Sequence, residues 1–206
     1  MPGDRGALTP RSIYGHLIQP EHDHHHLPVE SAMRLFREHV LSPIGTILLV
    51  SDGEALHALD FEDFESRALR LLQRYHGPCE LVPGRIAGVA ERIAAYFAGE
   101  LTTLAAIPVK TGGSEFQRRV WCALRVIPAG STMSYGHLAA EIGVPTASRA
   151  VGLANGANPV ALVIPCHRVI GANGRLTGYG GGLWRKAWLL QHEGGTAAGP
   201  LRSKAA

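Results

Sequence analysis

The sequence predicts an α/β protein of α+β type, in which a small antiparallel sheet with helices precedes a helical domain with a helix-turn-helix. Short apolar runs separated by turn residues follow residue 30, whereas apolar residues recur at helical spacing beyond residue 110. The 206 residues are 46% hydrophobic, which is enough for one domain or two small ones with a packed core. Charged residues make up 18%, below the roughly one-quarter of a typical soluble domain, so a charge-rich disordered chain is not expected.

We expect four segments: a disordered His-rich arm at 1–30, an α/β scaffold domain at 31–107, a second domain at 108–194 and a flexible tail at 195–206. The arm holds four of the thirteen prolines and shows no periodicity. It also holds five of the eleven histidines, at positions 16, 22, 24, 25 and 26. Clustered histidines can bind metal, but no cysteine lies nearby and nothing fixes a geometry, so we expect no specific metal site.

The scaffold domain begins with strands expected at 34–41, 45–50 and 55–61. Turn residues Ser42–Pro43 and Asp52–Gly53 separate them, which indicates an antiparallel meander. Two helices are expected next, at about 62–75 and 85–98, because apolar residues recur there every three or four positions. Nothing in this domain indicates catalysis.

The second domain is expected to be mostly helical. Ser114 and Gln117 have the spacing of a capping box ahead of an amphipathic helix. Ser134 can cap a short helix that Gly143 stops, and Thr146 can cap another helix at 147–156. Two short helices joined by a tight turn match a helix-turn-helix, although many helical hairpins share that pattern.

The helix at 147–156 is nearly bare, because alanine and glycine dominate it and Arg149 is its one long side chain. Such a helix can approach another surface closely, or it can pack tightly on a neighbouring helix; both can hold on different faces. After it, the apolar run 160–164 is typical of a buried strand or extended segment, and it leads directly into Pro165-Cys166-His167-Arg168. A glycine-rich loop at 171–182 and a last helix at 183–193 complete the domain.

Charge divides the chain unevenly. Residues 1–107 carry nine Lys/Arg and fourteen Asp/Glu, whereas residues 108–193 carry nine Lys/Arg and only three acids. A polyanion-binding domain attached to an ordinary one would show this asymmetry, and so would a solvated basic face. No apolar run reaches the roughly 20 residues of a membrane span and no secretory pattern is visible, so we expect a cytoplasmic protein without a membrane partner.

Three widely spaced cysteines do not make a disulfide framework, which fits a reducing compartment. Cys79 and Cys122 are expected to be buried packing residues. Cys166 differs because it adjoins His167, a base that can take the thiol proton directly or through a water. Glu193, at the end of the last helix, is the best candidate to orient that histidine.

The stretch IPCHRVI at 164–170 resembles the active-site signature of the O6-alkylguanine-DNA alkyltransferases. Four further blocks follow that family's order and spacing: GGSEFQRRVWCAL at 112–124, IPAGSTMSYGHLA at 127–139, RAVGLANGANP at 149–159 and GYGGGLWRKAWLLQHEG at 178–194. The resemblance covers about residues 110–194 densely. The N-terminal half is similar only in pattern, to the family's ribonuclease H-like domain.

The resemblance implies a suicidal repair reaction, in which Cys166 accepts the alkyl group from O6-alkylguanine in DNA and the molecule is spent. It also implies activity on O4-alkylthymine. His167, through a water, and Glu193 would form the proton relay; Asn158 would lie in a hinge before the active-site segment; Tyr135 would help rotate the phosphate and protonate the base. No cofactor and no metal are implied, since the damaged base is itself the donor.

The implied partner is double-stranded DNA, bound through the minor groove by a monomer with the damaged nucleotide flipped out. Arg149 would fill the space that the nucleotide leaves. The implied DNA-contacting residues are Arg149, Tyr135, Ala150, Gly152, Ser134 and Arg168. The implied substrate-pocket residues are Val169, Tyr179, Gly180, Gly181 and Ala161. With Gly180, Gly181 and Ala161 offering little side chain, we expect a low pocket wall that admits bulky alkyl groups.

Three other functions remain open. A non-catalytic protein that senses alkylated bases would lack the nucleophile, so Cys166 argues against it. A transcriptional regulator would bind undamaged operators through the helix-turn-helix. A Cys/His hydrolase would turn over repeatedly, whereas a suicidal transferase reacts once.

Overall fold

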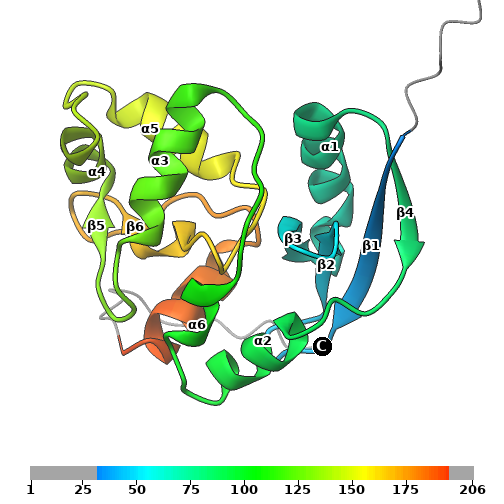
Figure 1. The fold of residues 1–206 in the computed structure, drawn as a ribbon. Helices are drawn as coiled ribbons and strands as arrows, with labels where there is room; N and C mark the ends of the chain where they lie inside the picture. Colours follow the sequence, from blue (N-terminus) through cyan, green and yellow to red (C-terminus); the bar gives the residue numbers. More distant parts are fainter. Residues whose placement is uncertain (1–31, 195–206) are drawn as a thin grey trace, which may run out of the picture. The chain divides into compact units, whose positions relative to one another are not determined.

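A computed structural model describes residues 32–194, and these residues form one compact unit. Its main sheet has four strands in the order β3-β2-β1-β4 (Figure 1). The strands β1 (Met33–Val40), β2 (Ile47–Ser51) and β3 (Leu56–Phe61) pair antiparallel, within two residues of the predicted bounds. The predicted α+β class with its small sheet and helical second half is confirmed.

The fourth strand corrects one part of that prediction. The sequence pattern does not predict β4 (Cys79–Pro83), which pairs parallel with β1, so the sheet is mixed rather than antiparallel. A parallel partner needs a crossover connection, and α1 (Glu65–His76) supplies it between β3 and β4. The strand is five residues long, ends in a proline and lies at the sheet edge, where the apolar pattern is weak.

The sheet is packed on both faces. A small cluster with Leu48, Val50 and Leu72 fills the space between the sheet and α1. The larger cluster joins Leu49 and Leu59 to residues of the helical half. The two halves of the chain therefore share one core. The predicted helix at 62–75 begins with a 3₁₀ turn at Glu62–Phe64, and α2 spans Val89–Phe97 within the predicted 85–98.

The helical half contains α3 (Glu115–Arg125), α4 (Tyr135–Glu141), α5 (Ser148–Gly156) and α6 (Leu183–His192). A 3₁₀ turn at Thr103–Ala106 precedes it, and β5 (Met133–Ser134) pairs parallel with β6 (Val169–Ile170). The capping box of Ser114 and Gln117 and the cap of Ser134 are confirmed. The predicted Thr146 cap is wrong: α5 starts one residue later, after Ala147, whose backbone N–H closes a turn onto Val144 O at 2.8 Å.

The apolar run 160–164 is buried as predicted, but it forms a tight turn rather than a strand. Val160 bridges Leu59 of β3, and Ile164 N donates back to Val160 O at 3.0 Å. Leu162 has a φ of 65°, which a branched side chain adopts only under constraint. Apolar periodicity cannot distinguish these buried conformations in so short a run. The turn delivers the chain into the segment that begins with Cys166.

None of the helices that the structure describes is long and apolar enough to cross a membrane.

Candidate active site

Cys166 opens the 3₁₀ turn Cys166–Arg168 and is 5% exposed. Its Sγ accepts a hydrogen bond from Asn158 Nδ2 at 3.1 Å. The same amide nitrogen lies 2.8 Å from Ile164 O, to which it also donates, and Asn158 Oδ1 accepts from Val160 N at 3.0 Å. Asn158 therefore ties the thiol to both ends of the buried turn that precedes it.

A buried histidine–carboxylate pair follows the thiol. His167 is fully buried, and its Nε2 lies 3.0 Å from Glu193 Oε1. Arg168 donates to the same carboxylate through Nε at 2.9 Å and Nη2 at 2.8 Å, and Tyr96 donates its hydroxyl at 2.8 Å. His167 Nδ1 has no hydrogen-bond partner among the described residues. The structure thus brings together the cysteine, histidine and glutamate that the sequence singled out.

The electrostatics of this group favour a neutral histidine beside an ionised glutamate. Burial lowers the pKa of His167, although Glu193 opposes that effect. Burial alone would raise the pKa of Glu193, but the hydrogen bonds from His167 and Arg168 hold it well below its usual range. An ionised Glu193 accepts the Nε2 proton, which leaves Nδ1 with the lone pair that can accept another.

The thiol itself is held in its neutral form. Burial raises the pKa of Cys166, while the Asn158 hydrogen bond and the charges of Arg67 and Lys186 act in the opposite direction. A base is therefore needed to remove its proton.

Arg168 corrects the predicted set of DNA-contacting residues. Its side chain is buried, and in addition to the two bonds to Glu193 it donates from Nη1 to Ile127 O at 2.5 Å. A guanidinium with these three internal partners, on a side chain that is 9% exposed, has little surface to offer a phosphate. Arg168 instead stabilises the charge of Glu193.

Two residues of the site, Lys186 and Tyr96, are not among those predicted from the sequence. Lys186 is fully buried and donates from Nζ to Val169 O at 2.6 Å and Thr177 O at 2.7 Å; burial lowers its pKa to about 8. Its position gave a signal, because it lies three and four residues before Leu189 and Leu190, on the face that α6 buries. Tyr96 gave none, since it lies 97 positions from its partner Glu193.

The glycine loop packs closely against its neighbours at Gly180 and Gly181. A Cβ on Gly181 would lie 2.6 Å from the Phe61 ring and 2.9 Å from the Tyr179 ring, and one on Gly180 would lie 2.7 Å from Arg67 Cζ. These glycines therefore permit close packing, and a low pocket wall that admits bulky groups stays a prediction. The Tyr179 hydroxyl, Val169 and Ala161 are buried, and Ala161 N donates to Leu59 O at 2.9 Å.

The bare helix α5 uses its small residues on two faces. Inward, Val151 and Ala154 are buried, and Trp121 Nε1 donates to Ala154 O at 2.9 Å. Outward, Arg149, Ala150 and Leu153 are exposed, with Leu153 at 73%. Tight inward packing of the helix is confirmed, and its approach to another surface stays a prediction.

The two helices of the predicted helix-turn-helix also meet. A Cβ on Gly152 would stand in ordinary contact with the Tyr135 ring of α4, at 3.7 Å. Ser134 caps α4 with its hydroxyl, and the Tyr135 hydroxyl accepts a hydrogen bond from Thr177 at 3.4 Å. An alanine would therefore fit at position 152, and the contact between α4 and α5 does not depend on glycine there.

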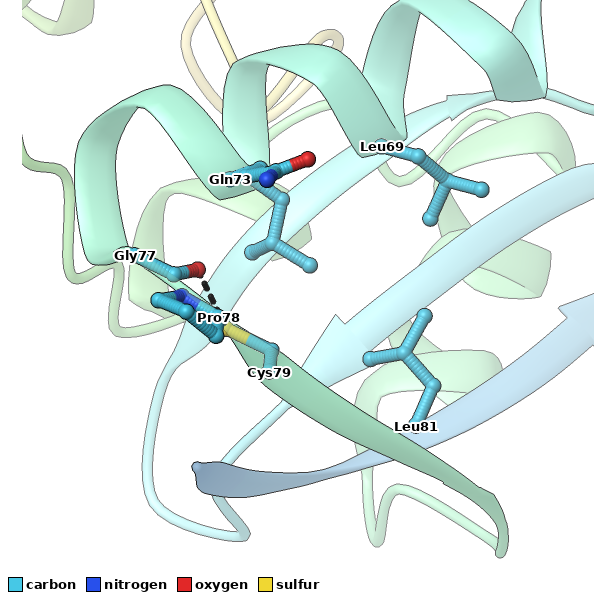
Figure 2. A pocket seen from close by; sticks show the side chains of 7 residues that line it. Leu69, Gln73, Gly77, Pro78, Cys79 and Leu81 are labelled. Atoms are coloured by element: carbon cyan, nitrogen blue, oxygen red, sulfur yellow. Dashed lines mark hydrogen bonds between the residues drawn. The ribbon is translucent and has the colours of Figure 1, made fainter. Parts of the chain in front are cut away.

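The other cysteines lie outside this site. Cys122 is exposed, so the prediction that it is a buried packing residue is wrong, and Cys79 is half-buried. Cys79 lines an apolar pocket of about 370 Å³ between α1 and β4, with Leu69, Leu72, Gln73, Gly77, Pro78 and Leu81 (Figure 2). None of these lining residues belongs to the group around Cys166.

Within residues 32–194, no three or more His, Cys, Asp or Glu side chains are grouped to hold a metal ion. The predicted His-rich arm and the predicted tail lie outside the described residues. The histidines that could bind a metal belong to that arm, so they lie outside as well.

A mixed sheet shares one core with a helical half, and this half holds a buried cysteine followed by a His–Glu pair. Together these features define a protein with a buried thiol close to a potential base. Comparisons with known proteins agree on its kind. Residues 115–195 match the family of the 6-O-methylguanine DNA methyltransferase DNA-binding domain, and residues 35–111 match that of its ribonuclease-like domain.

Curated relatives extend the match. The methylated-DNA–protein-cysteine methyltransferase of Mycolicibacterium paratuberculosis is 63% identical over 156 residues, covering 74% of this chain and 88% of the relative. That of Salmonella typhimurium is 48% identical over 166 residues, covering 79% and 97%. The crystal structure of Mycobacterium tuberculosis OGT in complex with DNA superposes with a TM-score of 0.68 at 44% identity, covering 79% of this chain and 93% of that one.

The chain belongs to the methylated-DNA–protein-cysteine methyltransferase family. Its activity is DNA repair by alkyl transfer to a cysteine, and the binding-only alternative is not favoured.

Proposed function

We propose that Cys166 is the alkyl acceptor and that its substrate is O6-alkylguanine in duplex DNA, with O4-alkylthymine as a second substrate. The Cys166 thiolate attacks the alkyl carbon, the bond from that carbon to O6 breaks, and its electron pair stays on the base, which takes up a proton. The product is a thioether, which water does not cleave, so each molecule reacts once. No cofactor takes part, because the damaged base supplies the alkyl group.

The observation that carries this proposal is the buried thiol of Cys166, which Asn158 binds and which the buried His167–Glu193 pair follows directly in the sequence. His167 Nδ1, which is buried and accepts from no described residue, takes the thiol proton through a water. Glu193 then stabilises the imidazolium. Because burial favours the neutral thiol, this transfer makes the nucleophile only when the relay is complete.

DNA binding is assigned to the outward face of α5 and the neighbouring cap of α4. Ala150 and Gly152 let the helix enter the minor groove, and Arg149 enters the base stack when the damaged nucleotide is extruded. Ser134 and Tyr135, at the start of α4, contact the backbone at the flipped nucleotide. Val169 and Tyr179 line the pocket that receives the base. The domain limits 31–107 and 108–194, a monomeric state and a cytoplasmic location stay predictions.

The test incubates the protein with duplex DNA that carries labelled O6-methylguanine. We expect label on the peptide that contains Cys166, rising to one per protein molecule and no further. Repeated turnover would instead indicate a hydrolase, and DNA binding without transfer would indicate a sensing protein.

Replacing Arg149 with Ala should slow repair in duplex DNA about a hundred-fold, because base extrusion costs a few kcal/mol that an inserted side chain offsets. Reaction with the free base O6-benzylguanine needs no extrusion and should change little. Arg92→Ala, at an exposed arginine of α2, is the matched control and should leave both rates unchanged. If the reaction rates with duplex DNA and with the free base fell equally, Arg149 would have no role in base extrusion.

Replacing Gly181 with Ala should slow transfer of methyl and benzyl groups alike, by about ten-fold, because the added carbon displaces the loop from Phe61 and Tyr179. The control Gly178→Ala, in the same loop, meets nothing within 4 Å and should react normally. Single-turnover rates on both substrates check this result. A selective loss of benzyl transfer would restore the pocket-wall role of Gly181.

A further inference from the structure

The hinge segment, residues 156–159 at the C-terminal end of α5, is held by hydrogen bonds from the other half of the chain. Its four consecutive backbone carbonyls all accept hydrogen bonds from the sheet-bearing half. Arg67 Nη2 of α1 donates to Gly156 O at 2.7 Å and to Asn158 O at 3.1 Å. Tyr75, also of α1, donates its hydroxyl to Ala157 O at 3.2 Å. Leu59 N of β3 donates to Pro159 O at 3.0 Å.

Arg67 is itself held in place by two contacts. Its Nη1 forms an ion pair with Asp60, whose side chain is buried at the end of β3. Its guanidinium also packs against Gly180, where an added Cβ would lie 2.7 Å from Cζ. A forked guanidinium can serve two carbonyls and a carboxylate at once, whereas an ammonium is a single point charge. The positive charge also lies at the carbonyl end of α5, where a cation is favourable.

We propose that Arg67 is a positioning residue for alkyl transfer: it holds the hinge segment so that Asn158 stays in contact with the thiol of Cys166. The chain of contacts is short, since Arg67 binds the Asn158 carbonyl and the Asn158 amide donates to Sγ. The sheet-bearing half thus takes part in the reaction rather than serving only as a scaffold. This inference rests on the proposed role of Cys166.

The charge of Arg67 adds a second effect. Burial is the largest influence on the pKa of Cys166 and raises it; Arg67 and Lys186 lower it, and Asp60 raises it. The titratable and charged side chains that face Cys166 from the surrounding elements are Asp60, Arg67, Tyr135, Tyr179 and Lys186, with His167 and Glu193 in the adjoining relay. Loss of the Arg67 charge removes one of two cations that favour the thiolate.

The test measures two quantities on the full chain: the single-turnover rate of methyl transfer from duplex DNA, and the pH midpoint for alkylation of Cys166 by iodoacetamide without DNA. Peptide mass spectrometry separates Cys166 from Cys79 and Cys122. We expect Arg67→Gln to slow transfer about thirty-fold, since small misplacements of a reacting group cost one to two powers of ten. The midpoint should rise by about 0.5 unit, because a cation near the thiol is lost.

Arg67→Lys keeps the charge but cannot serve both carbonyls. It should restore the pH midpoint and recover only part of the rate. Arg70→Gln, an exposed arginine on the same helix, is the matched control and should match the wild type in both quantities. If the urea midpoint shows that Arg67→Gln does not fold, the methyl-transfer rate of Arg67→Lys tests the inference instead.

The inference would be overturned if folded Arg67→Gln kept the wild-type transfer rate and pH midpoint. It would also be overturned if Arg67→Lys transferred at the full wild-type rate. The wild type separates this failure from failure of the proposed function. If Cys166 of the wild type takes no label from DNA, the proposed acceptor is wrong; if it is labelled and the Arg67 variants react equally fast, only the positioning role falls.

Discussion

Cys166→Ala should abolish alkyl transfer and leave affinity for DNA nearly unchanged. The reaction needs a sulfur electron pair at this position, whereas the 5% exposure of Cys166 leaves it little part in docking. The substitution also spares its surroundings, because Asn158 Nδ2 still donates to Ile164 O when Sγ is gone. Label transfer from O6-methylguanine DNA measures the first expectation, and a gel shift on the same duplex measures the second.

The remaining cysteines provide the control. Cys122 is exposed on α3 and Cys79 is half-buried at the sheet edge, so Cys79→Ala and Cys122→Ala should both transfer at the wild-type rate. Transfer that survives in Cys166→Ala and disappears in Cys122→Ala would move the nucleophile to α3, and the proposed mechanism would fail.

Elements with local signals could be predicted from the sequence. The capping box at Ser114 joins two residues three positions apart, and the strands β1 to β3 are delimited by their own turn residues. The strand β4 could not be predicted, because its pairing with β1 depends on a partner more than forty positions away, with Cys79 opposite Met33. The buried turn at 160–164 escaped prediction because an apolar run indicates burial without specifying the backbone path.

Composition overstated the charge available for DNA. Of the nine Lys/Arg in residues 108–193, Arg168, Arg185 and Lys186 are buried and bind internal partners. Arg185, for instance, donates to Ile44 O at 2.8 Å and pairs with Asp63 at 2.9 Å. Charge counts locate a basic segment, but only the fold says which cations face outward.

The residues of the candidate site also differ in whether the sequence could predict them. Cys166, His167 and Glu193 could be singled out because a reactive motif and a scarcity of acids mark them. Arg67 and Tyr96 could not be predicted, because Arg67 reaches Asn158 across 91 positions and Tyr96 reaches Glu193 across 97. Such contacts are set by how the halves pack, which no local pattern encodes.

Glu193→Gln should lower the free energy of unfolding, which is the second large effect that we expect. The Glu193 carboxylate belongs both to the proposed proton relay and to the buried core. Glu193 accepts hydrogen bonds from Arg168 and Tyr96, and its Oε1 lies 3.0 Å from His167 Nε2. An amide cannot accept all of these bonds, and it leaves the buried Arg168 charge without a counterion. Removing one member of a buried pair costs about 3 kcal/mol in free energy of unfolding. Glu100→Gln, at an exposed glutamate, is the matched control and should be neutral.

The pH dependence identifies the charge as the cause. The folded-state pKa of Glu193 lies well below the value in the unfolded chain, about 4.3. A depressed carboxyl pKa contributes stability that is fully present above the unfolded value and is lost as the pH falls toward the folded one. The difference in unfolding free energy between wild type and Glu193→Gln should therefore be largest near neutral pH and shrink as the pH drops below about 4. Urea denaturation across this range measures it, and a difference that does not change with pH would mean that shape, not charge, makes Glu193 important.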